Sequence, residues 1–507
     1  MSHGSDSLSY GDALFLYLER KGMPLNIASV HFFEGDIPLA DCIAYVKSKL
    51  PLLPRYTQRL TTPPLNIGLP RWEDDPSFDV HNHLSELTLK HGTDAEVKAI
   101  AGKILSETLD RNRPLWHLTF LHGLKGGGTA VVTRIHHCLA DGVAGIGLIN
   151  LLMDTTPAVR RRRKKVGHQP EPRRDPTSMF LDWSMNSYFS TIQRLLKMQA
   201  EVLELVHKMV INREEWPLGE FEHLLPELVA PTQPLPFNVV CEGPQKIAWA
   251  EAPMADIEAI RHALGATVND VALAIVTSVL RRYVELRGVS TEGRLLRIMV
   301  PVNVRQNGDS HVGNRISLVP VTIPLDIRSP RKLIAAVHQR TSFIKHAHLA
   351  EFVGLAGTLF GTIPPAVQAV AGPIASQLPI TPFNLVCTNV PGPQIPLYFM
   401  GHRMARWYPY VPIGGDMAMN CAILTYNGTA YFGFNGDVHA APDISRLEQF
   451  FKTSLNEVRK AGGVKIPRQR KHKPPTKKPV ATAEQPAAEQ AKEPRPQEEK
   501  AFAAAAD

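Results

Sequence analysis

The chain has 507 residues, 44% of them hydrophobic and 21% charged, as is typical of a globular protein with a buried core. A chain of this length is longer than a typical domain with a single hydrophobic core, so two or more domains are expected. The formal net charge of +8 comes mainly from two Pro-flanked runs, residues 160–174 and 465–478, so it does not indicate a nucleic-acid-binding face. Five scattered cysteines without a CxxC pair argue against a disulfide framework or a zinc site and favour a reducing, cytoplasmic compartment.

Residues 1–155 are predicted to form a mixed α/β unit. Its last two strands are joined by Lys125-Gly126-Gly127-Gly128, which predicts a hairpin turn rather than a phosphate loop, because a strand and not a helix follows. The predicted elements are a helix beginning near residues 9–13, an extended stretch near 28–33, helices at 40–50 and 94–109, and strands at 115–121 and 129–135.

Residues 156–237 are predicted to form a basic linker, a helical segment and a Pro-rich crossover. A second α/β unit is expected at 238–462, and a disordered basic and then Ala/Pro/Glu-rich tail at 463–507. The predicted strands of the second unit are 245–251, 296–304, 316–324, 384–388, 420–426 and 430–436, and its predicted helices are 255–263, 267–287, 330–347 and 443–460.

A histidine pair lies where the strand at 129–135 is expected to end. The segment reads His136-His137-Cys138-Leu139-Ala140-Asp141-Gly142, and the apolar spacing of residues 143–153 predicts a helix after it. An imidazole near its neutral pKa is a suitable base for taking a proton from an alcohol. We expect Asp141 to hold the shape of the loop and Gly142 to permit a positive φ angle. A histidine pair by itself is more often structural than catalytic, and Cys138 is expected to be a small buried filler.

The string His-His-x-x-x-Asp-Gly with apolar flanks resembles the motif of the CoA-dependent acyltransferases that share the chloramphenicol acetyltransferase-like fold. More specifically, the chain resembles the bacterial wax ester synthase/diacylglycerol acyltransferase family over nearly its whole ordered length. Four further blocks carry this resemblance in the same order: Leu8 to Phe15, Leu109 to Trp116, Val268 to Val271 and Asn389 to Pro393.

This resemblance implies a two-lobed α/β fold of mixed sheets with flanking helices. It implies that His137 is the general base, that His136 is a supporting neighbour, and that Asp141 is structural and paired with an arginine such as Arg305. An alternative remains open, because His136 and Asp141 also satisfy the His-x4-Asp pattern of glycerol-phosphate acyltransferases, in which His136 is the base.

The other blocks also have plain structural interpretations. Pro114-Leu115-Trp116 is expected to be core packing, and Asn389 to Pro393 a tight turn. Thr267 followed by Asp270 fits a helix N-cap with an acid at the third helical position. Asn269 is a candidate to direct its amide at a developing oxyanion; normal turnover of Asn269→Ala would remove that role.

The implied reaction is direct acyl transfer from acyl-CoA, a co-substrate, to diacylglycerol or a long-chain alcohol. It needs no metal and no prosthetic group. Two alternatives stay open: the same fold acylating another hydroxyl or amine, such as a polyketide or sugar, or a non-catalytic protein that binds acyl-CoA or lipid.

We expect peripheral contact with the inner face of a membrane or with lipid inclusions. No secretory signal and no run of about 18 apolar residues stands in the sequence. Residues 352–401 contain no Asp, Glu, Lys or Arg; such a run is either plain core, a lipid-facing surface or the wall of an acyl tunnel. The two basic runs either attract anionic lipid or serve as a solubilising linker and tail.

Overall fold

The computed structural model describes residues 7–139, 149, 151–158, 232–303, 316–346, 363–378 and 383–465. The described residues all belong to one compact unit. The basic run at 160–174, the helical segment at 179–212 and nearly all of the tail lie outside the described residues. The predictions made for them, and the predicted domain limits, stay predictions.

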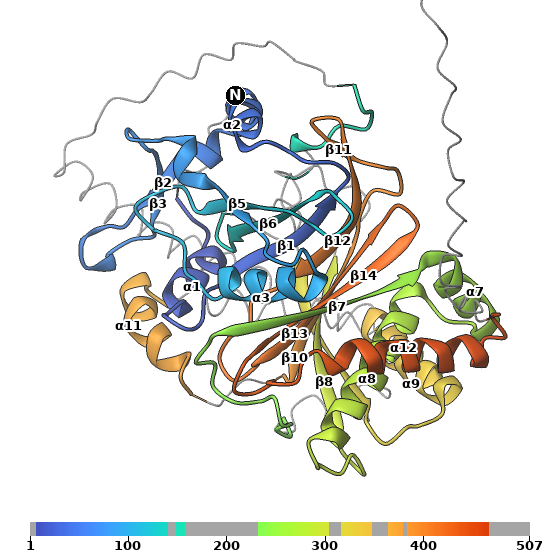
Figure 1. The fold of residues 1–507 in the computed structure, drawn as a ribbon. Helices are drawn as coiled ribbons and strands as arrows, with labels where there is room; N and C mark the ends of the chain where they lie inside the picture. The colour runs from blue at the N-terminus through green and yellow to red at the C-terminus, as the bar shows by residue number, and fades with distance from the viewer. Residues whose placement is uncertain are drawn as a thin grey trace, which may run out of the picture. The chain divides into compact units, whose positions relative to one another are not determined.

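The described strands form two six-stranded sheets and a two-stranded ribbon (Figure 1). The strands of the first sheet, in spatial order, are β11 (Tyr398–Phe399), β12 (His402–Tyr410), β1 (Asn26–Phe33), β6 (Thr129–His136), β5 (Trp116–His122) and β4 (Leu84–Thr88). β5 and β6 pair antiparallel, which confirms the predicted hairpin. At its end, Gly128 has a φ of +102°, and a Cβ there would lie 2.5 Å from the carbonyl oxygen of Phe33, so only glycine fits.

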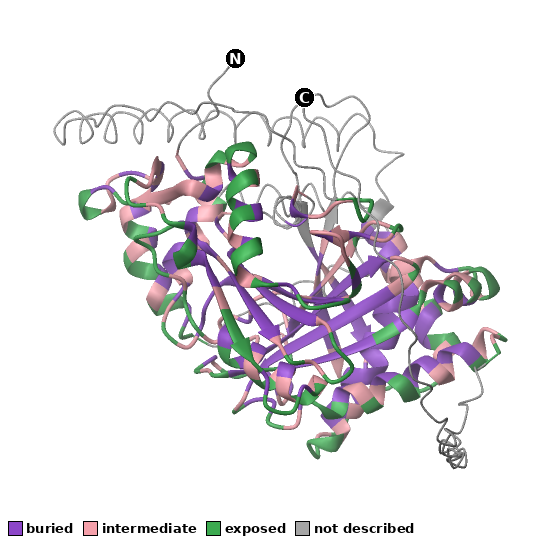
Figure 2. Ribbon diagram, turned by 45° about the horizontal axis from the view of Figure 1, so that its top comes forward, coloured by how far each residue is buried: buried purple, intermediate pink, exposed green. Residues whose placement is uncertain are grey.

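The second sheet is mixed. Its strands, in spatial order, are β7 (Gln245–Pro253), β14 (Thr429–Asp437), β13 (Met419–Tyr426), β10 (Leu385–Pro391), β8 (Leu295–Asn303) and β9 (Ile316–Pro324). β10 is parallel to both of its neighbours, and the other pairs are antiparallel. Figure 2 shows that the strands at the centre of the molecule are mostly buried.

β12 was not predicted from the sequence, and it links the two predicted α/β units. It comes from the segment 238–462, yet it pairs antiparallel with β1, with Tyr408 opposite Val30 and Tyr410 opposite Ala28. It also contacts β13 and β14 of the second sheet. Trp407, Tyr408 and Tyr410 are buried, so the strand is stabilised by large aromatic side chains as well as by its backbone hydrogen bonds.

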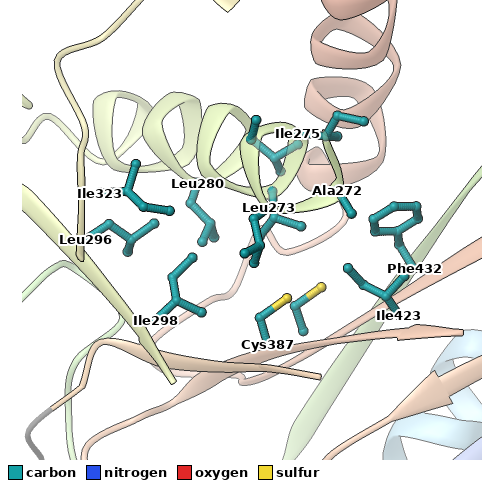
Figure 3. Close-up of a cluster of buried hydrophobic side chains, with 14 of the residues drawn as sticks. Ala272, Leu273, Ile275, Leu280, Leu296, Ile298, Ile323, Cys387, Ile423 and Phe432 are labelled. Carbon is teal, nitrogen blue, oxygen red and sulfur yellow. The ribbon is translucent and has the colours of Figure 1, made fainter. Parts of the chain in front are cut away.

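The second sheet is covered by helices. α8 (Val268–Leu286) is buried along most of its length and packs with α7 (Met254–Leu264), α9 (Pro330–His346) and α12 (Arg446–Ala461). Figure 3 shows Leu273 and Leu280 of α8 on the side of Ile298 of β8, and Ala272 of α8 beside Phe432 of β14. These elements agree with the predicted ones to within a few residues.

The capping prediction for α8 is confirmed. Thr267 and Asp270 form a reciprocal capping box at its N-terminus. The carboxylate of Asp270 also accepts hydrogen bonds from His338 (2.7 Å) and Thr341 (2.6 Å) of α9. Burial alone raises the pKa of Asp270, but the hydrogen bonds from Thr341, His338 and Thr267 outweigh it and lower the pKa. Asp270 therefore acts as a structural anion joining two helices.

The first sheet carries α2 (Leu39–Lys49) and α3 (Asp94–Leu105), and α3 also packs against β7 of the second sheet. Ser106, at the end of α3, accepts a hydrogen bond from the backbone N–H of Gln245 (2.7 Å). Trp249 of β7 stacks on Tyr408 of β12, with ring centroids 4.5 Å apart. Polar and aromatic contacts thus join the two sheets.

The first helix, α1 (Tyr10–Leu18), lies against α11 (Pro365–Ala375). α11 also contacts the 3₁₀ turn η3 (Pro64–Asn66), which lies between β2 (Gln58–Thr61) and β3 (Arg71–Asp74). Gly372 of α11 approaches α1 closely, since a Cβ there would lie 2.9 Å from the carbonyl oxygen of Tyr17.

One local prediction was wrong. Asn389 to Pro391 belong to strand β10 and not to a turn.

In the part of the chain that the structure describes, no single helix has the length and apolar character to cross a membrane. Only α7 and α8 taken together have them, and the two helices are bent by 101° relative to each other.

Candidate active site

The histidine pair is held by backbone hydrogen bonds at the end of β6. His136 is the last residue of that strand. Its N–H donates to the carbonyl of Leu115 (3.0 Å), and the N–H of His137 donates to the carbonyl of Leu25 (3.0 Å). The N–H of Leu139 donates to the carbonyl of His136 (2.9 Å), closing a turn. We call residues 136–139 the histidine loop.

The two histidines have different surroundings. His136 is 0% exposed, whereas His137 is only partly buried. The ring of His137 stacks on Phe15 of α1, with centroids 3.7 Å apart and planes 13° from parallel. Phe15 stands in the opening block that supported the family resemblance. The stacking orients the imidazole plane while leaving His137 partly accessible.

Protein groups face both ring nitrogens of His136. Nδ1 accepts a hydrogen bond from the backbone N–H of Cys138 (3.1 Å). A neutral imidazole that accepts at Nδ1 carries its proton on Nε2, and Nε2 lies 3.4 Å from Oε1 of Glu19. This enclosed ring has no access to a substrate. The geometry therefore disfavours the alternative in which His136 is the base and agrees with a supporting role.

Sequence reasoning missed Glu19, the residue just after α1. Its side chain is 2% exposed. Oε1 accepts a hydrogen bond from the N–H of Leu25 (3.0 Å) and Oε2 one from Arg111 (3.0 Å). Burial alone raises the pKa of Glu19, but its contacts with His136, Leu25 and Arg111 more than offset this and lower the pKa. Glu19 is thus a buried carboxylate kept in its charged form.

Arg111 completes this group of charges. It lies in the block from Leu109 to Trp116, in which the sequence predicted core packing for Pro114-Leu115-Trp116 and no role for Arg111. Its guanidinium donates to the carbonyl of Leu16 in α1 (2.8 Å) as well as to Glu19. In the sequence, Glu19 lies four residues after the opening block and Arg111 lies inside the block from Leu109 to Trp116, and no local pattern pairs them. Their partnership is visible only once α1 packs beside the histidine loop.

The packing prediction for Pro114-Leu115-Trp116 is confirmed. Leu115 and Trp116 are almost completely buried. The indole N–H of Trp116 donates to the carbonyl of Tyr56 (2.8 Å), and its ring stacks on His83. The block supports the loop indirectly, because the carbonyl of Leu115 holds His136.

Cys138 is a buried filler, as predicted. Burial raises the pKa of its thiol well above the usual value, so it is a poor candidate for a thiolate nucleophile. The five cysteines are all free and buried. Within the described ranges, no group of three or more His, Cys, Asp or Glu side chains has an arrangement that could hold a metal ion.

The structure brings together two blocks that are 120 residues apart in the sequence. Nδ2 of Asn389 in β10 donates to Oδ1 of Asn269 in α8 (3.2 Å). Because this bond holds the carbonyl oxygen of Asn269 toward Asn389, it leaves the NH2 of Asn269, the donor of the amide, directed elsewhere. That is the orientation an oxyanion donor needs. Among the described residues, neither asparagine is hydrogen-bonded to the histidine loop. The oxyanion role stays a prediction.

Three predicted site residues lie outside the described residues. They are Asp141, Gly142 and Arg305. The pairing of Asp141 with Arg305 and the conformation of Gly142 therefore stay predictions.

Solved structures share this architecture. A wax ester synthase/diacylglycerol acyltransferase from Marinobacter aquaeolei VT8 matches 90% of this chain and 100% of its own, with a TM-score of 0.62 and 21% identity. The first condensation domain of the calcium-dependent antibiotic synthetase matches 90% of this chain and 97% of its own, with a TM-score of 0.55 and 14% identity. The fold is therefore that of the two-lobed, chloramphenicol acetyltransferase-like class, and the predicted α/β fold class is confirmed.

Sequence comparison places the chain within that class. Residues 8–272 match the wax ester synthase/diacylglycerol acyltransferase catalytic domain, and residues 312–459 match the C-terminal domain of the same family. The chain belongs to the wax ester synthase/diacylglycerol acyltransferase family and is an O-acyltransferase. Among similar proteins, a probable diacylglycerol O-acyltransferase of Mycobacterium tuberculosis is 28% identical over 450 residues, covering 86% of this chain and 92% of the relative. A second, putative one from the same organism is 28% identical over 476 residues, covering 89% and 90%.

Proposed function

We propose that this protein transfers an acyl chain from acyl-CoA to the hydroxyl of diacylglycerol or of a long-chain alcohol, with His137 as general base. One observation carries the assignment of the base. His137 is the partly accessible member of the pair, oriented by Phe15, while His136 is enclosed between Cys138 and Glu19. The substrates follow from the family and from the names of the similar proteins.

The reaction needs one proton acceptor and two aligned substrates. His137 takes the proton of the acceptor hydroxyl, and the oxygen attacks the thioester carbonyl of acyl-CoA. The tetrahedral oxyanion then collapses, the carbon–sulfur bond breaks, and the CoA thiolate takes the proton from His137. Asn269 is the candidate donor to the oxyanion. We propose that no metal or prosthetic group takes part, acyl-CoA being a co-substrate.

We expect CoA release when purified full-length protein is mixed with palmitoyl-CoA and either hexadecanol or diolein. The free thiol is measured with a thiol reagent, and the ester product is identified by mass spectrometry. Release with a sugar or an amine acceptor but with neither lipid would favour the second enzyme hypothesis. Binding of palmitoyl-CoA without release in any mixture would favour a non-catalytic lipid-binding protein.

A second part of the proposal concerns where the acceptor is met. Large apolar side chains are exposed on α11 and on η3, which contact each other. Leu65 is 86% exposed although its φ is +54°, an uncommon conformation for this residue type, and Val370 is 71% exposed. Together with Leu378, just after α11, we call this set the α11 patch; its members are Leu65, Val367, Val370, Ile374 and Leu378.

The α11 patch lies over an apolar layer that reaches the histidine loop. Ala369, on the inner side of α11, packs against the cluster that contains Tyr17, Trp72 and Cys138. All members of the patch except Leu65 belong to residues 352–401, which contain no charged side chains. A contiguous exposed apolar surface marks an interaction site. A site that is uncharged and connected to the histidine loop suits an acceptor lipid that is dissolved in a membrane. We therefore propose that the α11 patch contacts a membrane or a lipid inclusion.

Replacement of Val370 and Ile374 by glutamate is expected to reduce flotation of the protein with phosphatidylcholine/diolein liposomes severalfold, because charge on the patch opposes insertion. The matched control is Leu87→Glu with Leu286→Glu, two apolar side chains exposed elsewhere, on β4 and α8. Equal flotation of the two double variants would refute the patch as the contact surface. A change of oligomeric state in gel filtration without a change in flotation would instead assign the patch to a second copy of the chain.

A further inference from the structure

We infer that Glu19 is a positioning residue for His137, holding the histidine loop through the two residues that flank His137. This inference rests on the proposed role of His137 as the general base. Three chain segments meet at the Glu19 carboxylate: the residues just before β1, the histidine loop and the block that contains Arg111.

The first connection passes through a single residue. Oε1 of Glu19 accepts the N–H of Leu25 (3.0 Å), and the carbonyl of the same Leu25 accepts the N–H of His137 (3.0 Å). The position of the His137 backbone is therefore tied to the Glu19 carboxylate through one peptide segment. Loss of the carboxylate leaves the Leu25 N–H without its partner in a buried setting, which favours a shift of Leu25.

The second connection passes through the other histidine. Oε1 of Glu19 faces Nε2 of His136 at 3.4 Å, which favours the tautomer with the proton on Nε2. That tautomer leaves Nδ1 as the acceptor for the N–H of Cys138 (3.1 Å). His136, before His137, is thus held through its side chain, and Cys138, after His137, is held through its backbone N–H. Both contacts depend on the orientation of the His136 ring.

α1 adds the orientation of the His137 ring itself. Phe15 and Glu19 are four residues apart at the end of α1, so they lie on the same side of the helix. Phe15 stacks on the ring of His137, and Glu19 holds the backbone around it. Arg111 neutralises Glu19 and is itself fixed by the carbonyl of Leu16. The end of α1 therefore controls both the ring plane and the backbone position of the proposed base.

Removal of the carboxylate is expected to affect turnover more than substrate binding. A displacement of about 1 Å in a reacting group can cost about 100-fold in rate. We expect Glu19→Ala to lower kcat by about 100-fold while the KM values for palmitoyl-CoA and diolein change less than about threefold. Glu19→Gln keeps an oxygen that can accept the N–H of Leu25, and its kcat is expected to lie within about tenfold of the wild type.

The matched control is Asp256→Ala, which breaks the largely buried ion pair with Arg459 between α7 and α12. We expect this variant to lose thermal stability with kcat changed less than about twofold. All variants are assayed by CoA release below their measured unfolding temperatures, so that loss of folded protein is not read as loss of turnover.

Three outcomes separate this inference from the proposed function. Wild-type turnover by Glu19→Ala, or a Glu19→Gln variant no better than Glu19→Ala, would overturn the positioning role. Wild-type turnover by His137→Ala would overturn the proposed base, and with it the role of Glu19. An inactive His137→Ala together with an unimpaired Glu19→Ala would leave the proposed function intact and remove only the inference.

Discussion

Replacement of His137 by alanine is expected to lower kcat by about 1000-fold, the middle of the range for loss of a general base. The KM for palmitoyl-CoA is expected to change little, because the imidazole acts on the acceptor hydroxyl and not on the CoA portion. CoA release measured with palmitoyl-CoA and diolein gives both constants. The physical basis is that no other group of the histidine loop can substitute: His136 is enclosed, and burial raises the pKa of the Cys138 thiol well above its usual value.

The control for this variant is His262→Ala. His262 lies on α7 with its side chain 70% exposed, so its removal is expected to leave kcat and the unfolding temperature unchanged. If the His137 variant turned over within about tenfold of the wild type, general-base catalysis by this residue would be excluded. A His136→Ala variant that lost activity while His137→Ala kept it would restore the alternative His-x4-Asp assignment.

Replacement of Gly433 by alanine is expected to destabilise the protein by about 3 kcal/mol, at the upper end of the usual cost of overpacking. A Cβ at this position of β14 would lie 1.8 Å from the carbonyl oxygen of Pro409 in β12. The position of this Cβ is set by the backbone of β14, and the carbonyl belongs to the backbone of β12. Each strand is held by its own sheet partners, so neither atom can move as the end of a flexible side chain does. The free energy of unfolding is measured by urea titration. The dependence of this free energy on urea concentration is compared between the variants, because an equal dependence shows that the difference is one of stability.

Gly11→Ala is the matched control. The nearest atom to a Cβ at Gly11 of α1 is Oγ of Ser9, at an ordinary contact distance of 3.8 Å. Alanine is the better helix former by up to about 1 kcal/mol, so this variant is expected to be as stable as the wild type or slightly more so. A Gly433→Ala protein with unchanged stability would mean that β12 does not pass so close to β14.

Local patterns predicted most of the regular structure. α8, for example, follows from a Thr/Asp capping pair and a long apolar period. The β5–β6 hairpin follows from an apolar stretch and a β-branched stretch on either side of three glycines. Such signals act over a few residues and can be read from the sequence. The prediction at Asn389 was wrong because Pro391-Gly392-Pro393 is a strong turn signal, whereas the preceding residues pair with β13 in the middle of a sheet.

The pairing of β12 with β1 could not be read in the same way. Ala28 and Tyr410 are opposite each other although several hundred residues separate them in the sequence. The Pro, Tyr and Arg residues of β12 give no clear alternation of apolar and polar residues. The strand is stabilised by aromatic packing of Trp407 and Tyr408 against side chains of both sheets. Only the complete fold places Trp249 and Tyr431 where they can pack against Tyr408 of this strand.

By itself the sequence indicated the class of chemistry, because a histidine motif and the blocks around it are contiguous strings that resemble those of a known acyltransferase family. It also determined that His137 was the first candidate for the base. The tertiary structure decided which histidine is accessible and which is enclosed. It also brought Glu19 and Arg111 to the histidine loop and placed the backbone of Pro409 in β12 directly against Gly433 of β14. Each of these depends on contacts between segments distant in the chain, and such contacts leave no local pattern from which they can be predicted.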